Sequence, residues 1–124
     1  MNIAAGGLNR DGRFWSAIRF AQVQTAKRER RRRAAHLPSE AVAEPAWDIL
    51  LELYAFELVG RAGSQTEIAE RIQVPSTTSI RWMKVLEAAD LIARTIDPAD
   101  PLSVKVGMTP KGLAAMEAYF SGAD

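Results

Sequence analysis

The sequence contains no cysteine and a single histidine, His36. The lack of cysteine excludes disulfides, thiolate zinc sites, iron–sulfur clusters and cysteine nucleophiles. One histidine supports neither a histidine metal cluster nor a histidine-based catalytic triad. Glycines occur as Gly6-Gly7 and otherwise singly, and no phosphate-binding glycine loop is present. We therefore expect a protein that is not an enzyme and that needs no cofactor or metal.

Long hydrophobic runs are also missing. The longest strictly apolar runs are a few residues, far below the roughly 20 residues that span a bilayer. The N-terminus from Met1 to Leu8 is mildly apolar, but no apolar core follows a basic start as in a secretory signal. An arginine-rich arm can resemble a transit peptide, but the block from Arg30 to Arg33 lies deep in the chain, beside Glu29. We expect a cytoplasmic protein with no membrane contact.

The length of 124 residues predicts one domain, and the net charge of +1 hides an uneven distribution. Residues 1–36, the basic arm, carry nine basic and two acidic residues, which gives +7. Residues 37–124, the acidic body, carry seven basic and thirteen acidic residues, which gives −6. The chain is therefore predicted to consist of a basic helical arm, 1–36, and a folded domain, 37–124.

The arm has the pattern of a helix from about Gly12 to Ala35, ended by Leu37-Pro38. Its first half has an apolar stripe at helical spacing that consists of Phe14, Ala17, Ile18 and Ala21. Trp15 lies at the margin of this stripe. No apolar residue occurs from Lys27 to Arg33. Three interpretations compete: a clamp on DNA phosphates, a dimerisation helix, or a helix folded onto its own domain with a solvated charged end.

The body shows the order of a winged helix-turn-helix. A mostly apolar helix, 45–59, precedes a short helix, 67–72, with a Ser64/Glu67 capping box. A tight connection leads to a helix that Ser76 or Thr77 is predicted to cap and that runs to about Ala89; we name it the reader helix. Strands 91–96 and 102–108 form a hairpin, and a last helix runs from Thr109-Pro110 to near Phe120. The predicted fold is mainly α with a small two-stranded β wing and an extra N-terminal basic helix.

The reader helix has two distinct faces at about 100° per residue. The predicted core face consists of Ser79, Trp82, Met83, Leu86 and Ala89. The opposite face holds Thr77, Arg81, Lys84 and Ala88, flanked by Ile80 and Val85. Arginine can engage guanine O6 and N7 together, while lysine and hydroxyls suit phosphates or base edges. A solvated amphipathic helix would show the same two cations, but the order of the elements around it favours DNA.

The segment from Ser64 to Gly112 resembles the MarR family of bacterial winged-helix regulators. The resemblance rests on five stretches: Ser64 to Ala69, Pro75 to Thr78, Leu86 to Arg94, Asp97 to Asp100 at the wing, and Met108 to Gly112. It implies a winged helix-turn-helix that binds DNA and dimerises through helices at both ends. Asp90 stands where glycine is usual in the family, and Pro101 and Leu102 stand where its wing has an arginine. Leu113 and Met116 of the last helix are predicted in the core, whereas Tyr119 and Phe120 fit either the core or a dimer interface.

We therefore predict a sequence-specific regulator of transcription that binds double-stranded DNA as a homodimer, with the N-terminal helix as a candidate interface. The predicted DNA contacts are Ser76, Thr77, Thr78, Arg81 and Lys84 of the reader helix, Arg94 and Lys105 of the wing, and Arg28, Arg30, Arg31, Arg32 and Arg33 of the arm. The alternative is a winged-helix module that binds a protein partner without specific DNA binding. Its support comes from the acidic body, the missing wing arginine and the apolar flanks of the reader helix.

Overall fold

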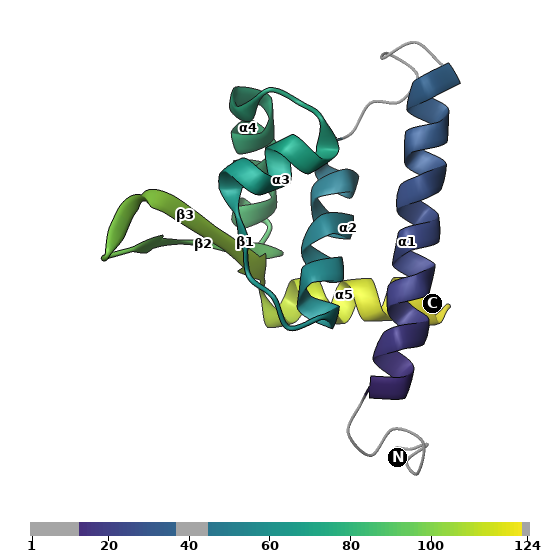
Figure 1. The fold of residues 1–124 in the computed structure, drawn as a ribbon. Helices are drawn as coiled ribbons and strands as arrows, with labels where there is room; N and C mark the ends of the chain where they lie inside the picture. The colour runs from purple at the N-terminus through teal and green to yellow at the C-terminus, as the bar shows by residue number, and fades with distance from the viewer. Residues whose placement is uncertain (1–12, 37–44, 123–124) are drawn as a thin grey trace.

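The computed structural model describes residues 13–36 and 45–122, with the side chains of 32–36 left undescribed. The elements follow in the order α1 (Arg13–His36), α2 (Pro45–Leu58), β1 (Gly63–Ser64), α3 (Gln65–Ile72), α4 (Ser76–Ala88), β2 (Ile92–Asp97), β3 (Asp100–Met108) and α5 (Pro110–Ser121). Figure 1 shows α1 alongside α2, with α3 and α4 on the other side of α2 and the β2–β3 hairpin projecting outward. The predicted mainly helical fold with a β wing is confirmed.

Helix α2 is the centre of the molecule because it is apolar on most of its circumference. Leu53 and Phe56 pack with the buried residues of α3, α4 and the sheet, among them Ile68 and Met83. On the other side, residues of α2 pack with α1 and α5 in a second cluster: Val23, Leu51, Tyr54, Ala55 and Met116. The helix-turn-helix and the α1–α5 layer therefore share one central helix.

The sheet has three strands where the sequence predicted two. Its order is β1-β3-β2, and Gly63 and Ser64 pair antiparallel with Val106 and Lys105 of β3. The two-residue β1 is too short to show an alternating pattern, so no sequence pattern indicates this strand. A Cβ on Gly63 would lie 2.6 Å from the ring of Phe56, so this strand needs glycine where it crosses α2.

Helix α3 and the turn after it follow the predicted local signals. Ser64 Oγ accepts the N–H of Glu67 at 3.1 Å, which confirms the N-terminal cap. Gln73 ends the helix in the left-handed region at φ 60°, and three residues later α4 has begun. The predicted cap of α4 by Ser76 or Thr77 is wrong. Pro75 occupies the N-cap position, and no side chain caps this end.

The burial of α4 agrees with its predicted faces, with one correction. Ser79, Met83 and Leu86 are buried, and Trp82 is half-buried. Ala89, predicted to face the core, is exposed because the helix ends at Ala88 and the chain turns away there. The turn passes through Asp90 at φ 61°, the left-handed conformation for which glycine is favoured. Asp90 therefore adopts the left-handed backbone conformation that glycine favours, at the position where the family usually has glycine.

Helix α1 packs on the body through a face that the sequence did not single out. Val23 is fully buried against α2, and Phe20 and Ala26 pack beside it. The predicted apolar stripe does not make this contact: Phe14, Trp15, Ala17, Ile18 and Ala21 are all exposed. The interpretation of a helix folded onto its own domain is thus correct for one face, while the apolar stripe stays uncovered.

Candidate nucleic-acid interface

The outer face of α4 carries the predicted reader residues. Thr77, Arg81 and Lys84 are exposed, as is Ala88. Among the residues that the structure describes, the side chains of Arg81 and Lys84 form no hydrogen bond or ion pair, and Lys84 only helps Arg94 to lower the pKa of Glu87. Two cations on an uncovered helix face therefore keep their full hydrogen-bonding capacity for an external acceptor.

The N-terminal end of α4 is also open. Ser76 is exposed and Thr78 is half-buried, so the two hydroxyls are not equally accessible. Because Pro75 provides no side-chain acceptor, the first backbone N–H groups of α4 lack a cap within the chain. The end of a helix with unpaired N–H groups and a positive dipole can receive a phosphate oxygen.

Arg94, the first of the two predicted wing cations, is already engaged. Its Nη2 lies 2.9 Å from Glu87 Oε1, and its Nη1 donates to Gln65 Oε1 at 3.1 Å. The hydrogen bond from Arg94 lowers the pKa of Glu87 below its ordinary value of 4.5. This arginine therefore joins β2 to α4 and α3. Lys105, the second cation, is exposed and forms no ion pair within the described residues.

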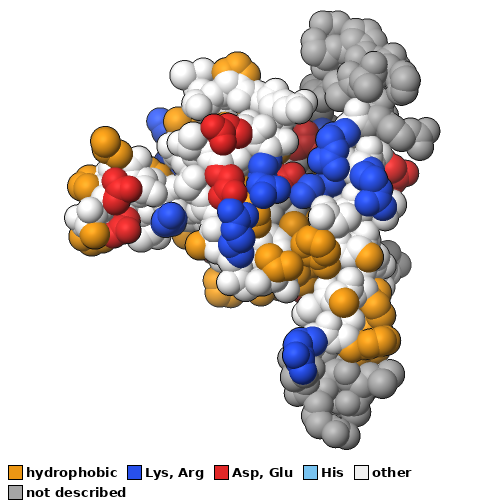
Figure 2. All heavy atoms as spheres, in the orientation of Figure 1, with side chains coloured by type: hydrophobic (Ala, Val, Ile, Leu, Met, Phe, Trp, Pro, Cys, Tyr) orange, Lys and Arg blue, Asp and Glu red, His pale blue; other side chains and the backbone are white. Residues whose placement is uncertain are grey.

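The wing tip, residues 96–104, carries carboxylates and apolar side chains and no lysine or arginine. Leu102 is 95% exposed and Ile96 is 62% exposed. Ile96 pairs with Val104, and both side chains lie on one face of the hairpin. Closer to the body, the same face carries the buried Ile92 and Val106. Figure 2 shows hydrophobic and acidic side chains together on this projecting hairpin. The apolar face of the wing thus continues past the core into solvent.

The predicted arm contacts divide into two groups. Arg30 Nε lies 2.8 Å from Asp48 Oδ1 of α2, so its guanidinium is bound by the body. Arg31 is exposed and without an ion pair among the described residues, and Arg28 donates to Thr25 Oγ1 of its own helix. The side chains of Arg32 and Arg33 lie outside the described residues. Acids of α2 thus hold two cations of the segment from Lys27 to Arg33: Glu52 pairs with Lys27, and Asp48 pairs with Arg30.

The junction between α4, β2 and α5 fixes the wing relative to the reader helix. A Cβ on Gly112 would lie 2.0 Å from the carbonyl oxygen of Leu91, so only glycine allows this approach. Thr109 caps α5 by accepting the Gly112 N–H, and its own hydroxyl donates to the carbonyl of Asp90 at 2.5 Å. Lys111 Nζ donates to the carbonyl of Ala89 at 3.2 Å. The start of α5 therefore holds the end of the reader helix.

Sequence reasoning missed a set of charges behind this surface: Lys27, Glu52, Arg61, Glu67 and Arg71. Glu52 gave the one available signal, since it is a carboxylate within the apolar run of α2 and is buried in the structure. Glu67 was predicted only as a capping residue. Arg61 hydrogen-bonds its carboxylate, and this is the main reason that the pKa of Glu67 lies below its ordinary value.

The sequence and the fold were compared with those of known proteins. No protein-family model and no curated protein matches the sequence. Among solved structures, the S. aureus MepR–DNA complex matches at 28% identity and a TM-score of 0.58, over 64% of this chain and 62% of the MepR chain. The chain thus covers less than two thirds of that MepR chain.

Two further structures agree in fold. MepR in its DNA-binding conformation matches at 21% identity and a TM-score of 0.58, over 87% of this chain and 74% of that one. The transcriptional regulator SlyA matches at 23% identity and a TM-score of 0.52, over 62% and 51% of the two chains. MepR and SlyA are MarR-family regulators. The chain therefore has the winged helix-turn-helix fold of the MarR family, as its sequence motifs predicted.

Proposed function

We propose that this protein is a sequence-specific transcriptional regulator that binds double-stranded DNA with α4 in the major groove. The observation that carries the proposal is the outer face of α4, where Arg81 and Lys84 are exposed and unpaired within the described residues. The same fold occurs in a MepR–DNA complex at 28% identity. The major groove admits one α-helix, and an uncovered helix of a helix-turn-helix is the element that enters it.

In this arrangement Arg81 reads a base and its neighbours orient the helix. The guanidinium of Arg81 presents two parallel donors that fit guanine O6 and N7. Lys84, Ser76, Thr77 and the less exposed Thr78 contact phosphates or base edges, which sets register more than sequence. Lys105 adds a phosphate contact beside the wing. Arg94 contributes less, since Glu87 already neutralises much of its charge.

The basic end of α1 supplies further phosphate contacts. Arg31 lies in the hollow between α1 and the end of α3, together with Ile72 and Gln73, so this end of the arm borders the helix-turn-helix. We assign phosphate contacts to Arg28, Arg31, Arg32 and Arg33, and a smaller share to Arg30 because Asp48 binds it. Each neutralised phosphate releases counterions and steepens the dependence of affinity on salt.

The other end of α1 forms the homodimer interface in this proposal. The exposed stripe of Phe14, Trp15 and Ile18 lies on the half of α1 that packs beside α5, where Tyr119 is 63% exposed. Figure 2 shows hydrophobic side chains gathered on this lower part of α1. Pairing two such stripes would cover apolar surface that the monomer leaves in water. Trp15→Glu with Ile18→Glu is expected to convert a dimer to a monomer in sedimentation velocity.

Selection of bound duplexes from random DNA tests the proposed function. The expected result is an enriched palindrome whose half-sites lie about one helical turn apart. Enrichment of no sequence, together with no retention on heparin or random DNA at low salt, would instead support a protein-binding winged-helix module. The acidic and apolar wing tip is the observation that favours that second candidate.

A matched pair of variants tests the arm. Arg31→Ala is expected to lower the slope of log affinity against log salt by about 0.9 for all DNA sequences. Arg30→Ala removes the partner of Asp48 and is expected to lower stability more than the salt slope. Equal salt slopes for wild type and Arg31→Ala would remove Arg31 from the DNA surface.

A further inference from the structure

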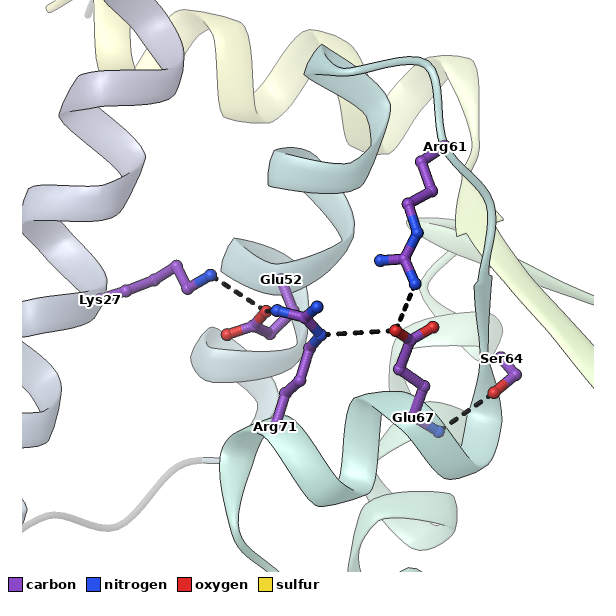
Figure 3. A network of polar contacts seen from close by, with 6 residues as sticks. All are labelled: Lys27, Glu52, Arg61, Ser64, Glu67 and Arg71. Carbon is purple, nitrogen blue, oxygen red and sulfur yellow. Dashed lines mark hydrogen bonds and ion pairs between the residues drawn. The ribbon is translucent and has the colours of Figure 1, made fainter.

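Five charged side chains form a continuous chain from the arm to the helix-turn-helix (Figure 3), which we name the ion-pair chain. Lys27 of α1 lies 3.1 Å from Glu52 of α2, and Arg71 of α3 lies 3.9 Å from the same Glu52 oxygen, Oε1. Arg71 also lies 3.6 Å from Glu67, whose carboxylate accepts from Arg61 at 2.5 Å. Positive and negative groups alternate along its whole length.

The first pair of this chain is buried, which is unusual for two charges. The side chains of Lys27 and Glu52 are 9% and 5% exposed. Removing two charges from water costs several kcal/mol per ion, and a well-packed apolar pair at such a site is often as stable or more stable. Stability alone therefore gives no reason to place a lysine and a glutamate between α1 and α2. The pair has a different possible role: because an ion pair has a defined geometry, it can hold the two helices in one position relative to each other.

The geometry makes Glu52 the common point of two helices. One of its oxygens receives a cation from α1 and a cation from α3, so a shift of either helix changes the contact of the other. Arg71 extends this link to Glu67 in the first turn of α3, beside the Ser64 cap. Only the short turn of Gln73 to Pro75 separates α3 from α4. A contact made at α1 is thus linked, through Glu52 and Arg71, to the helix that directly precedes α4.

We propose that Glu52 is a positioning residue for DNA binding, which ties the reader helix to the arm through Arg71 and Lys27. The proposal rests on the proposed DNA-binding function. It gives the buried pair a role in affinity: whatever holds α1, a second copy or a DNA phosphate, also holds α3 and α4. The Arg30–Asp48 pair joins α1 and α2 as well, so Glu52 is not the sole ionic link between these two helices.

The test replaces the buried pair by apolar residues of similar size, Lys27→Met with Glu52→Leu. Arg71 keeps Glu67 as its partner, so no buried charge is left alone. The urea midpoint is expected to stay or to rise, while affinity for the selected DNA falls about tenfold or more. Arg19→Met is the control, because Arg19 joins α1 to Glu117 of α5 and forms no ion pair with α3 or α4 in the part of the chain that the structure describes. It is expected to keep affinity within about twofold.

A second readout does not require DNA. The chain has no cysteine, so spin labels at Glu29→Cys and Ala88→Cys, both exposed, report the distance from α1 to α4. The double variant is expected to broaden or shift this distance distribution, and Arg19→Met is expected to leave it unchanged. If wild type binds no DNA, the proposed function fails and the distance distribution alone decides the role of Glu52.

A second variant keeps the proposal testable if the double variant fails to fold. Arg71→Met leaves the buried pair intact and changes a side chain that is 44% exposed. It is expected to reproduce the loss of DNA affinity and the broader distances. Wild-type distances in Arg71→Met, or in a folded double variant, would overturn the proposal, as would wild-type DNA affinity in either variant.

Discussion

The reader helix and the wing follow each other in the chain and present opposite chemistry. On α4, Arg81 and Lys84 face outward and make no ion pair within the described residues. On the wing, Arg94 binds Glu87 and Gln65, and the tip presents Asp97, Asp100 and the highly exposed Leu102. The reader helix has the charge that a DNA surface needs, and the wing tip does not.

This difference shows that an element can keep the shape of its fold without carrying the side chains that DNA binding needs. The wing keeps the pairing of β2 with β3 and its anchor on α5, so its shape is intact. Its tip carries Pro101 and Leu102 at the place where the resemblance to the MarR family predicts an arginine. Under the proposed function, we expect α4 and the arm to supply most of the affinity for DNA, and the wing tip to contribute little or to oppose binding.

The largest expected effect comes from the junction that both regions share. Gly112→Ala would place a Cβ 2.0 Å from the Leu91 carbonyl oxygen, so the backbone of α5 or of the turn after α4 must move. The free energy of unfolding is expected to fall by about 3 kcal/mol in urea titrations. Gly107→Ala is the control, since a Cβ there has no atom within 4 Å and should change stability little. Equal stability of the two variants would contradict the described junction.

The next prediction concerns the reader helix alone. Arg81→Ala is expected to cost about 2 kcal/mol of specific binding, roughly 30-fold in Kd, and to relax sequence preference at one base pair. Arg81→Lys keeps the charge and loses the two-pronged donor, so it should retain non-specific affinity while losing specificity. Fluorescence anisotropy with the selected duplex and a scrambled duplex separates the two effects. An unchanged Kd for Arg81→Ala would remove the base contact from the reader helix.

The buried face of the reader helix gives an intermediate effect. Ser79 is fully buried, and its hydroxyl has no hydrogen-bond partner within the described residues. Ser79→Ala is expected to raise the free energy of unfolding by about 1 kcal/mol, because it removes an unsatisfied hydroxyl and favours the helix. Ser16→Ala on α1 should show only the helix-propensity part, about 0.5 kcal/mol. A loss of stability in Ser79→Ala would mean that the hydroxyl has a partner.

A gain of function tests the wing. Leu102→Arg places a cation at the tip on a side chain that is 95% exposed, so the fold should tolerate it. Affinity for all duplexes is expected to rise severalfold, and the salt slope is expected to steepen by about one. Leu102→Gln controls for the loss of the apolar side chain. If Leu102→Arg binds DNA as wild type does, the tip lies away from the DNA backbone.

The smallest effect concerns the link between the two regions. Arg94 lowers the pKa of Glu87 in the folded state, so this pair stabilises the fold above pH 4.5 and is lost as the pH falls through the lowered value. Thermal unfolding of wild type and Glu87→Gln should differ slightly at pH 7 and converge on acidification. A difference that persists at pH 3 would mean that Glu87 acts through packing instead of charge.

Local signals in the sequence predicted most of the fold. The Ser64 cap, the proline at the start of α5 and the apolar core of α2 each specify a helix within a few residues, so the elements could be placed. The strand β1 could not, because two residues carry no periodicity and its pairing with β3 depends on contacts made by the folded chain. The outer face of α4 followed from helical spacing alone.

The candidate site was harder to predict where it depends on long-range contacts. The stripe of Phe14 and Ile18 was visible, but Val23 forms the real contact with α2 because only the folded chain decides which face turns inward. Arg94 and Arg30 look like free cations in the sequence, and their partners Glu87 and Asp48 lie 7 and 18 residues away. Sequence spacing shows which charges exist, and the tertiary structure decides which ones remain available.

Side-chain hydrogen bonds stabilise the C-terminal end of α4 but not its N-terminal end, and this difference should affect the hydrogen exchange of its backbone amides. At its C-terminal end, side chains of Thr109 and Lys111 bind the carbonyls of Asp90 and Ala89, whereas Pro75 leaves the N-terminal end without a side-chain cap. The amides of the first turn should therefore exchange with deuterium fastest, and those near Leu86 slowest. Because Ser76, Thr77 and Thr78 occupy that first turn, the residues proposed to contact DNA lie in the part of the helix where exchange is expected to be fastest.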